Sequence, residues 1–322
     1  MSKRLYNILL IIVFIPVQFF GQEINPGPGY QMILMSNPAL AGSEGDGVMR
    51  LSYLNAYPGN NYNLHSVYFS YDSFFPVLHG GAGIYLSDNY LGGIVNDIRG
   101  GLSYSYYVQV GKDLFINAGL SASVFHRGFN FNGAVLPDQI DPLGGVSYTS
   151  FETLSNTGKT VFDLGSGFLF IAGKVFGGFS INHLTEPDLS ADGTSDEKIN
   201  RKLFIHLAGD IDLNETRNLK IRPLGFFGAQ KGFIEGGLGT VLESNYMSIN
   251  VILLGDTGKN VDIQTGFSIN AGKLSIYYNY IFSIASGNNL VPLSLLHQAG
   301  LAFSLNSVDK RKTIKTINLP NL

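Results

Sequence analysis

The chain has 322 residues, of which 45% are hydrophobic and only 14% charged, with 40 Gly, 23 Phe, 17 Tyr, no Trp and no Cys. The charged fraction is low for a soluble protein, whereas a mean hydropathy of +0.14 is too low for a bundle of membrane helices. The net charge of −3 gives no indication of a nucleic-acid partner, and the lack of cysteine excludes disulfides, thiol nucleophiles, cysteine metal sites and a lipoprotein anchor.

Residues 1–21 have the pattern of a secretory signal peptide. Two basic residues precede a mostly apolar run, residues 5–20, which Pro16 interrupts. We expect cleavage near Gly21, although Phe19 is larger than a signal peptidase prefers, so the cleavage site stays open. An uncleaved anchor helix is the alternative, but the run is short for a bilayer span. No later run approaches the roughly 18 apolar residues that a spanning helix needs.

Residues 22–47 are rich in Gly and Pro and show no sustained period, so we expect a segment that precedes the sheet. It contains the stretch Asn37-Pro38-Ala39-Leu40-Ala41-Gly42-Ser43, in which Pro restrains the backbone and Gly permits a positive φ. One interpretation is a turn that leads into the first strand. The other is a segment folded into the mouth of a barrel, which fills a lumen otherwise open to ions. The second interpretation makes Asn37, Pro38, Ala41 and Gly42 candidate plug residues.

Alternation of apolar and polar residues then predicts fourteen strands. They are residues 48–56, 64–72, 78–87, 97–110, 113–125, 161–171, 174–182, 201–213, 218–227, 231–242, 246–254, 261–270, 273–284 and 295–306. Their lengths suit tilted barrel crossings of roughly 9–11 residues. We therefore predict an all-β fold, a transmembrane outer-membrane β-barrel of about 14 antiparallel strands. Pro223 removes a ladder hydrogen bond and calls for a bulge, so 12 and 16 strands are the alternatives.

The hairpin at residues 161–183 shows the alternation clearly. Its first strand places Phe162, Leu164, Phe168 and Phe170 on one face. The other face carries Asp163 and otherwise mostly Gly, Ser and Asn, which suits a crowded polar lumen better than a solvated surface. The pattern therefore indicates lipid outside the sheet and a polar interior.

Short and long connections alternate along the chain, as they do in outer-membrane barrels with short periplasmic turns and longer external loops. The longest connections are residues 126–160, 183–200 and 285–294. This alternation predicts an even strand count with both termini in the periplasm. We expect four parts: the signal peptide (1–21), the N-terminal segment (22–47), the barrel (48–306) and a periplasmic tail (307–322). The cationic start of the tail suits either solvation or docking of a periplasmic partner.

Catalytic, cofactor and metal sites are not predicted. The six histidines lie on different strands and loops, and no pair has the spacing of metal ligands. The enzyme alternative is a hydrolase site on the barrel rim, for which loss of hydrolysis on His183→Ala is the test. The loop acids Asp188, Asp192, Asp196 and Glu197 suit solvated charge better than calcium ligands. Glycines at 80–83 and 236–239 suit close backbone packing better than a phosphate cradle, because no helical pattern follows them.

Four motifs together resemble a known family. Tyr30-Gln31-Met32 and Asn37-Pro38-Ala39-Leu40-Ala41-Gly42 come first, then Asp138-Gln139-Ile140-Asp141-Pro142, then Gly178-Phe179-Ser180-Ile181-Asn182-His183-Leu184-Thr185-Glu186-Pro187. Their order and spacing are similar to those of the PorP/SprF family of type IX secretion system membrane proteins. The resemblance extends over about residues 22–306.

The resemblance implies an outer-membrane barrel of the Bacteroidetes lineage that works with a secretion and gliding apparatus. Such a barrel aids the export or surface anchoring of large adhesin cargo through protein–protein recognition, without enzyme activity or cofactors. Its implied partners are that cargo, outer-membrane lipid, and the periplasmic lipoprotein ring and motor components. External residues around Asp138, Asp141, His183, Glu186 and Pro187 would meet cargo. The alternative function is a FadL-like or porin-like transporter of small or hydrophobic solutes.

Overall fold

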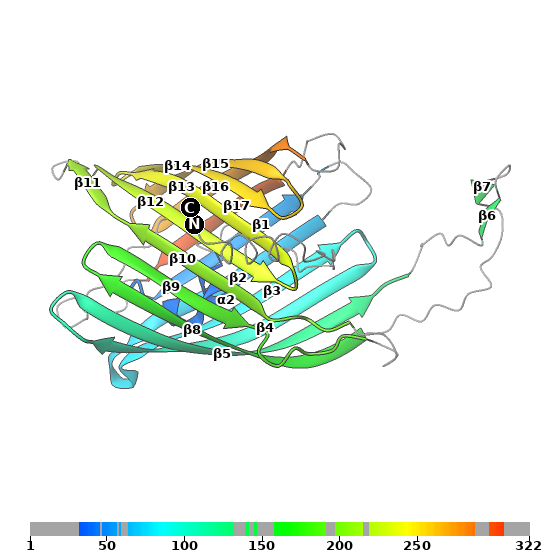
Figure 1. Ribbon diagram of the computed structural model, residues 1–322, viewed down its shortest axis with the longest axis horizontal. Coiled ribbons are helices and arrows are strands. Elements are labelled where there is room, and N and C mark those ends of the chain that lie inside the picture. The colour runs from blue at the N-terminus through cyan, green and yellow to red at the C-terminus, as the bar shows by residue number, and fades with distance from the viewer. Residues whose placement is uncertain are drawn as a thin grey trace, which may run out of the picture.

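The computed structural model describes residues 32–45, 47–56, 58, 64–131, 139–141, 145–146, 158–190, 197–214, 219–286 and 296–305. The expected signal peptide (1–21) and tail (307–322) lie outside these ranges. Figure 1 shows strands wound obliquely around a common axis to form one barrel. In the part of the chain that is described, no helix is long and apolar enough to cross a membrane.

The barrel wall is one closed antiparallel sheet. Its strands are β1 (Val48–Ala56), β2 (Leu64–Phe75), β3 (Gly80–Leu91), β4 (Val95–Gln109), β5 (Leu114–Phe129), β8 (Gly158–Ala172), β9 (Val175–Asn182), β10 (Lys202–Gly209), β11 (Ile211–Asn214), β12 (Leu219–Gln230), β13 (Phe233–Glu243), β14 (Met247–Asp256), β15 (Val261–Ala271), β16 (Leu274–Ala285) and β17 (Leu296–Ser304). β1 pairs with β17, and β10 and β11 both pair with β12 as two parts of one wall strand. The predicted barrel of 14 antiparallel strands is therefore confirmed.

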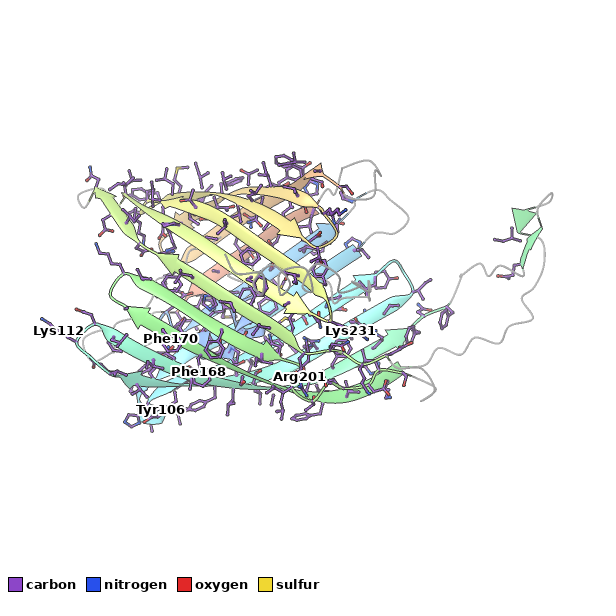
Figure 2. The ribbon with its side chains drawn as sticks, viewed as in Figure 1. Tyr106, Lys112, Phe168, Phe170, Arg201 and Lys231 are labelled. Carbon is purple, nitrogen blue, oxygen red and sulfur yellow. The ribbon has the colours of Figure 1, made fainter. Side chains whose placement is uncertain are left out.

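Side chains alternate between the two faces of the wall because successive strand residues point to opposite sides of a sheet. Outward positions keep large apolar side chains exposed, such as Leu120 at 65% and Leu238 at 72%, while inward Asn117 and Gln264 are fully buried. Figure 2 shows apolar side chains on the outside of the wall, with Lys112 at one end of the barrel. Such an apolar outer face is the arrangement that lipid requires.

The two ends of the barrel differ in their connections. At one end, here the short-turn end, tight connections join β2 to β3, β4 to β5, β8 to β9, β13 to β14 and β15 to β16. The first of these contains the short helix η2 (Pro76–Leu78). The other end carries the long connections, including a separate two-stranded sheet of β6 (Ile140–Asp141) and β7 (Gly145–Val146). By the usual asymmetry of outer-membrane barrels, the short-turn end is the one expected to face the periplasm.

The bulge expected at Pro223 is absent from the described wall. β12 keeps a continuous register with β13, in which Pro223 lies opposite Thr240. The interruption lies on the other side, where β10 ends at Gly209 and β11 begins at Ile211 in the same register. Because proline has no N–H to donate, the strand facing it lacks one ladder hydrogen bond. A strand break therefore takes the place of a bulge.

A stretch of chain before β1 lies inside the barrel. It contains the short helices α2 (Ile33–Ser36) and η1 (Pro38–Leu40), and we call residues 32–45 the luminal segment. Its apolar side chains form one buried cluster with inward residues of the wall, including Tyr68, Leu169 and Phe176. The largest hydrophobic core of the described molecule is thus the contact between this segment and the wall.

Candidate functional site

The luminal segment rests on inward-facing residues of β2 to β5 and β8 to β10. We call these wall residues the docking surface: Asp72, Gly81, Ser105, Tyr107, Gly119, Gly167, Gly178, Ser180, Asn182 and His206. The candidates Asn37, Pro38, Ala41 and Gly42 all lie within the segment, so the structure brings these four together inside the lumen.

Glycines let the segment approach the wall backbone. A Cβ atom placed on Gly81 would lie 1.9 Å from the carbonyl oxygen of Ala41, and one on Gly167 would lie 2.1 Å from Oδ1 of Asn37. Carbon atoms do not approach other heavy atoms this closely, so no larger residue fits without movement of the segment. Close backbone packing, expected for the glycines at 80–83, is therefore found at Gly81, and its partner is the luminal segment.

Asn37 is the most connected side chain of the segment. Its Oδ1 accepts a hydrogen bond from the backbone N–H of Ala39 at 3.0 Å, which caps η1. Its Nδ2 donates to the carbonyl oxygens of Phe168 at 3.1 Å and Phe179 at 3.5 Å, and lies 3.3 Å from Nε2 of His206. This buried amide therefore links the segment to three adjacent strands, β8, β9 and β10.

The turn that follows η1 is held by polar side chains of the wall. The hydroxyls of Ser105 and Tyr107 each donate to the carbonyl oxygen of Ala41 at 2.7 Å. The backbone N–H of Gly42 donates to Oδ2 of Asp72 at 2.8 Å. Gly42 has a φ of +67°, a conformation that glycine adopts without strain.

An ionic cluster fixes the carboxylate that receives Gly42. Arg50 of β1 donates to Oδ1 of Asp72 at 2.5 Å and also pairs with Glu44 of the segment. The guanidinium of Arg50 and the carboxylate of Asp72 are both buried. Because a buried charge is costly unless it is paired, the segment completes this cluster by adding Glu44.

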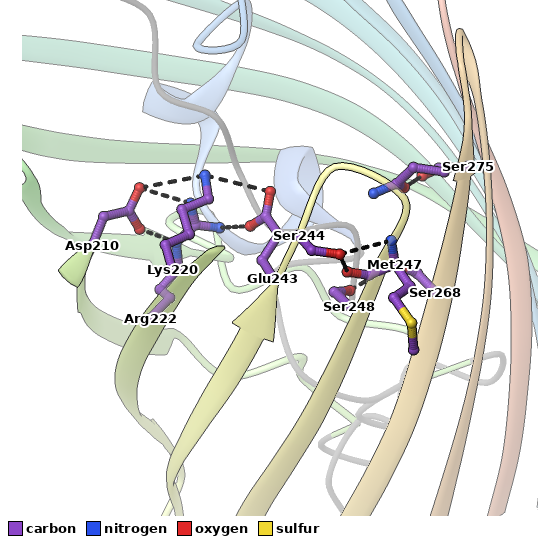
Figure 3. A network of polar contacts seen from close by, with 10 residues as sticks. Asp210, Lys220, Arg222, Glu243, Ser244, Met247, Ser248, Ser268 and Ser275 are labelled. Carbon is purple, nitrogen blue, oxygen red and sulfur yellow. Dashed lines mark hydrogen bonds and ion pairs between the residues drawn. The ribbon is translucent and has the colours of Figure 1, made fainter. Parts of the chain in front are cut away.

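A second charged cluster lies near the short-turn end, beside the interruption between β10 and β11. Figure 3 shows Arg222 and Lys220 of β12 between the carboxylates of Asp210 and Glu243. Arg222 pairs with Asp210 through Nε and with Glu243 through Nη1 at 3.3 Å, and Lys220 lies 3.4 Å from Glu243. These pairs hold β11, β12 and β13 together where the ladder is interrupted.

At the other end, the connection after β9 is folded against the wall. His183 has a φ of +59°, and its Nδ1 lies 2.6 Å from Oδ2 of Asp163. The other carboxylate oxygen, Oδ1, accepts a hydrogen bond from the hydroxyl of Thr185 at 3.0 Å. The side chain of His183 is only 2% exposed. The imidazole of His183 therefore does not lie at the surface, and it holds the start of the loop against the wall through Asp163.

The other external candidates have different positions. Glu186, with a φ of +44°, pairs with Arg201 at 3.3 Å at the surface, and the carbonyl of the buried Pro187 accepts from Ile199. Asp141 pairs with Gly145 in the separate two-stranded sheet. Asp138 lies outside the described residues. The structure thus brings Glu186 and Pro187 together with His183 and leaves Asp141 apart from them.

This loop also turns apolar side chains toward the lumen. Leu189 and Ile199 pack against Phe125, an inward residue of β5 that is 2% exposed. Lys159 donates from Nζ to the carbonyl oxygen of Ser190 at 2.8 Å. The mouth at the long-loop end is therefore partly covered by a folded loop.

The loop acids form no metal cluster within the described ranges. Asp192 and Asp196 lie outside those ranges. Asp188 accepts from the backbone N–H of Ser190 at 2.8 Å, and this hydrogen bond lowers the pKa of the Asp188 carboxyl. The stabilisation that the contact gives the loop is present at neutral pH and is lost as the pH falls through the lowered pKa.

The glycines of the docking surface were not predicted as functional residues. Their signal in the sequence is glycine at inward positions of strands that pair with each other, such as Gly167 of β8 and Gly178 of β9. The period of alternation assigns these positions to the lumen, but it does not reveal what fills the space. Only the structure shows that a segment from before the first strand occupies it.

Comparison with known proteins gives one family. The family model described as type IX secretion system membrane protein PorP/SprF matches residues 30–301. No curated protein sequence matches the chain.

Among solved structures, the chain is similar to the TodX deltaS2S3 mutant, a monoaromatic hydrocarbon channel, with 12% identity, a TM-score of 0.53, and 85% of this chain and 94% of that chain covered. It is also similar to CymD, a monoaromatic hydrocarbon channel, with 11% identity, a TM-score of 0.50, and 89% and 95% covered. At these identities the likeness shows the fold alone. The family match and the barrel fold place the chain in the outer membrane.

Proposed function

We propose that this chain, which belongs to the PorP/SprF family of type IX secretion system membrane proteins, acts in that apparatus by recognising proteins at its two ends. The observation that carries the proposal is the luminal segment, which fills space inside the wall and is bound to it by β2, β4, β8, β9 and β10. A barrel with such a folded filling suits a scaffold better than an open pore.

The long-loop end is the side that would meet secreted cargo of the adhesin type. Its loop after β9 is ordered by the contact between His183 and Asp163, which leaves Glu186 and Arg201 at the surface. An ordered loop loses less conformational entropy on binding than a flexible one. The short-turn end would meet the periplasmic lipoprotein ring and motor components.

The test is a strain that lacks this chain, complemented with the wild-type gene or with an Arg201→Ala/Glu186→Ala variant. We expect surface adhesins to be lost without the chain and restored by the wild type, and mild solubilisation of the outer membrane to recover cargo and periplasmic components with it. An unchanged set of surface proteins in the deletion strain would contradict the proposal.

A solute channel is the second candidate, because the two solved structures compared above are described as hydrocarbon channels. The buried contact between the luminal segment and the wall argues against a permanently open route. Uptake of labelled toluene by liposomes that hold the purified chain separates the two functions. Uptake above that of protein-free liposomes would favour the channel.

A further inference from the structure

The wall binds the luminal segment mostly through the segment's main chain. Ser180 donates to the carbonyl oxygen of Ser36, and Asn182 donates to that of Met35 at 3.0 Å. The carbonyl of Ala41 and the N–H of Gly42 are bound in the same way by Ser105, Tyr107 and Asp72. Recognition of main-chain groups together with a few side-chain positions is the usual way in which proteins bind peptides.

The segment also has its own internal structure. Ser36 donates its backbone N–H to Met32, Asn37 to Ile33, Leu40 to Asn37 and Ala41 to Pro38. The described segment forms no strand pairing with the wall. It can therefore leave the docking surface without breaking any ladder of the barrel.

Two glycines with positive φ lie in the last part of the segment, where it leads into the wall. Gly42 has a φ of +67° and Gly45 a φ of +81°, and both lie shortly before β1. Because glycine tolerates many backbone conformations, this stretch can reorient while β1 stays in place. The segment is thus a compact unit attached to the barrel by a glycine-containing connection.

Side-chain recognition is concentrated at one residue. Asn37 is fully buried between the carbonyls of β8 and β9 and the ring of His206, where Gly167 and Gly178 leave space for it. The turn beyond it requires a small residue at Ala41 and a glycine at Gly42. The surface therefore selects a peptide with an asparagine, followed by small residues and a glycine, and Arg50 favours an acidic residue two positions after that glycine.

We propose that the docking surface is a peptide-binding site and that the luminal segment is its resident ligand. A partner protein's peptide with the same asparagine, small residues and glycine displaces the segment. The identity of that partner as cargo or periplasmic component rests on the proposed function. The existence of the site does not rest on that function, so an experiment can refute the site and leave the proposed function standing, or the reverse.

A tethered segment acts at an effective concentration of the order of millimolar, so an added peptide competes poorly with the wild-type segment. The experiment therefore weakens the resident ligand. Purified full-length Asn37→Ala protein is placed in planar bilayers, and a synthetic peptide with the sequence of residues 32–45 is added at the short-turn side. The control is the same peptide with the Asn37→Ala change.

We expect the Asn37→Ala protein to conduct more than the wild type, because its segment leaves the surface more often. The wild-type peptide should reduce this conductance in a saturable way. The control peptide should need a concentration at least about tenfold higher, because it lacks the Asn37 amide and its several buried hydrogen bonds. Equal block by both peptides, or no block by either, would overturn the proposal.

A second readout avoids dependence on conductance. The chain has no cysteine, so Ala41→Cys introduces a single thiol on the segment. In the protein that also carries Asn37→Ala, this thiol should react faster with a charged maleimide than in the protein with Asn37 intact. Adding the wild-type peptide should not slow the reaction, since the bound peptide keeps the segment off the docking surface. A reaction rate unaffected by Asn37→Ala would also overturn the proposal. The heat-dependent shift of the barrel on gels checks that each variant is folded.

Discussion

A Cβ atom on Gly119 of β5 would lie 2.2 Å from the backbone nitrogen of Ala39 in the luminal segment. A residue in the middle of one strand thus depends on a segment from a different part of the chain. This contact is not part of the hydrogen-bond ladder of the sheet. Adding one methyl group at Gly119 therefore tests where the segment lies.

Gly119→Ala should push the segment off the docking surface, because overpacking costs about 1–3 kcal/mol when neighbouring atoms have no room to move. Gly128→Ala on the same strand is the matched control, since its nearest neighbour would lie at an ordinary 3.6 Å. We expect greater sensitivity of cells to large antibiotics with Gly119→Ala only. Equal sensitivity of both variants would count against the contact.

Asp72→Asn should destabilise the barrel by about 3 kcal/mol, because Arg50 would keep its buried charge with Glu44 as its remaining described ionic partner. Asp212→Asn is the control, since Asp212 pairs with Lys174 at the exposed surface, where ion pairs contribute about 0–1 kcal/mol. Urea unfolding in detergent, followed by far-UV circular dichroism, measures both. Similar midpoints for the two variants would refute the assigned role of Asp72.

Arg222→Met should loosen β11 and the adjacent part of β12, because Asp210 and Glu243 would lose the buried one of the two cations that join them beside the ladder interruption, which leaves the more distant Lys220. Hydrogen exchange should become faster at residues 211–214 and 219–223. Lys112→Met, at an exposed turn of the same end, should leave exchange unchanged. Faster exchange spread evenly over the wall would show that the cluster has no local role.

His183→Ala should release the loop after β9, since Asp163 would lose its imidazole partner inside the wall. Cleavage by added protease between residues 184 and 200 of intact cells should become several times faster, because limited proteolysis follows the population of the opened loop. Leu184→Ala, which removes an exposed neighbour, is the control. No difference between the two variants would contradict the anchoring role of His183.

Alternation alone predicted the wall well. The strand predicted at 48–56 has those bounds, and others, such as 261–270, differ from the observed strand by one residue. Register follows from the same pattern, since a slip by one residue would expose inward polar groups such as Asn279 to lipid. Pro223 was recognised as irregular, but its effect depends on which neighbouring strand faces the position where proline lacks an N–H.

The interior was less predictable. Asn37-Pro38-Ala39 suggested a turn, yet a turn on the surface and a turn inside the lumen have the same local sequence requirements. The ion pairs of Asp72 with Arg50 and of Asp163 with His183 join residues on different elements, so no spacing along the chain reveals them. His183 was expected near an external loop, and the sequence does not show that its side chain is buried against Asp163.

If the luminal segment closes the barrel, the purified wild-type chain has little ionic conductance in planar bilayers. We expect no steady channel for the wild type and a clear increase for the Asn37→Ala/Pro38→Gly variant, which loses the amide contacts and the restrained turn. A wild-type chain that opens a stable pore and passes solutes according to their size would show that the luminal segment does not close the barrel.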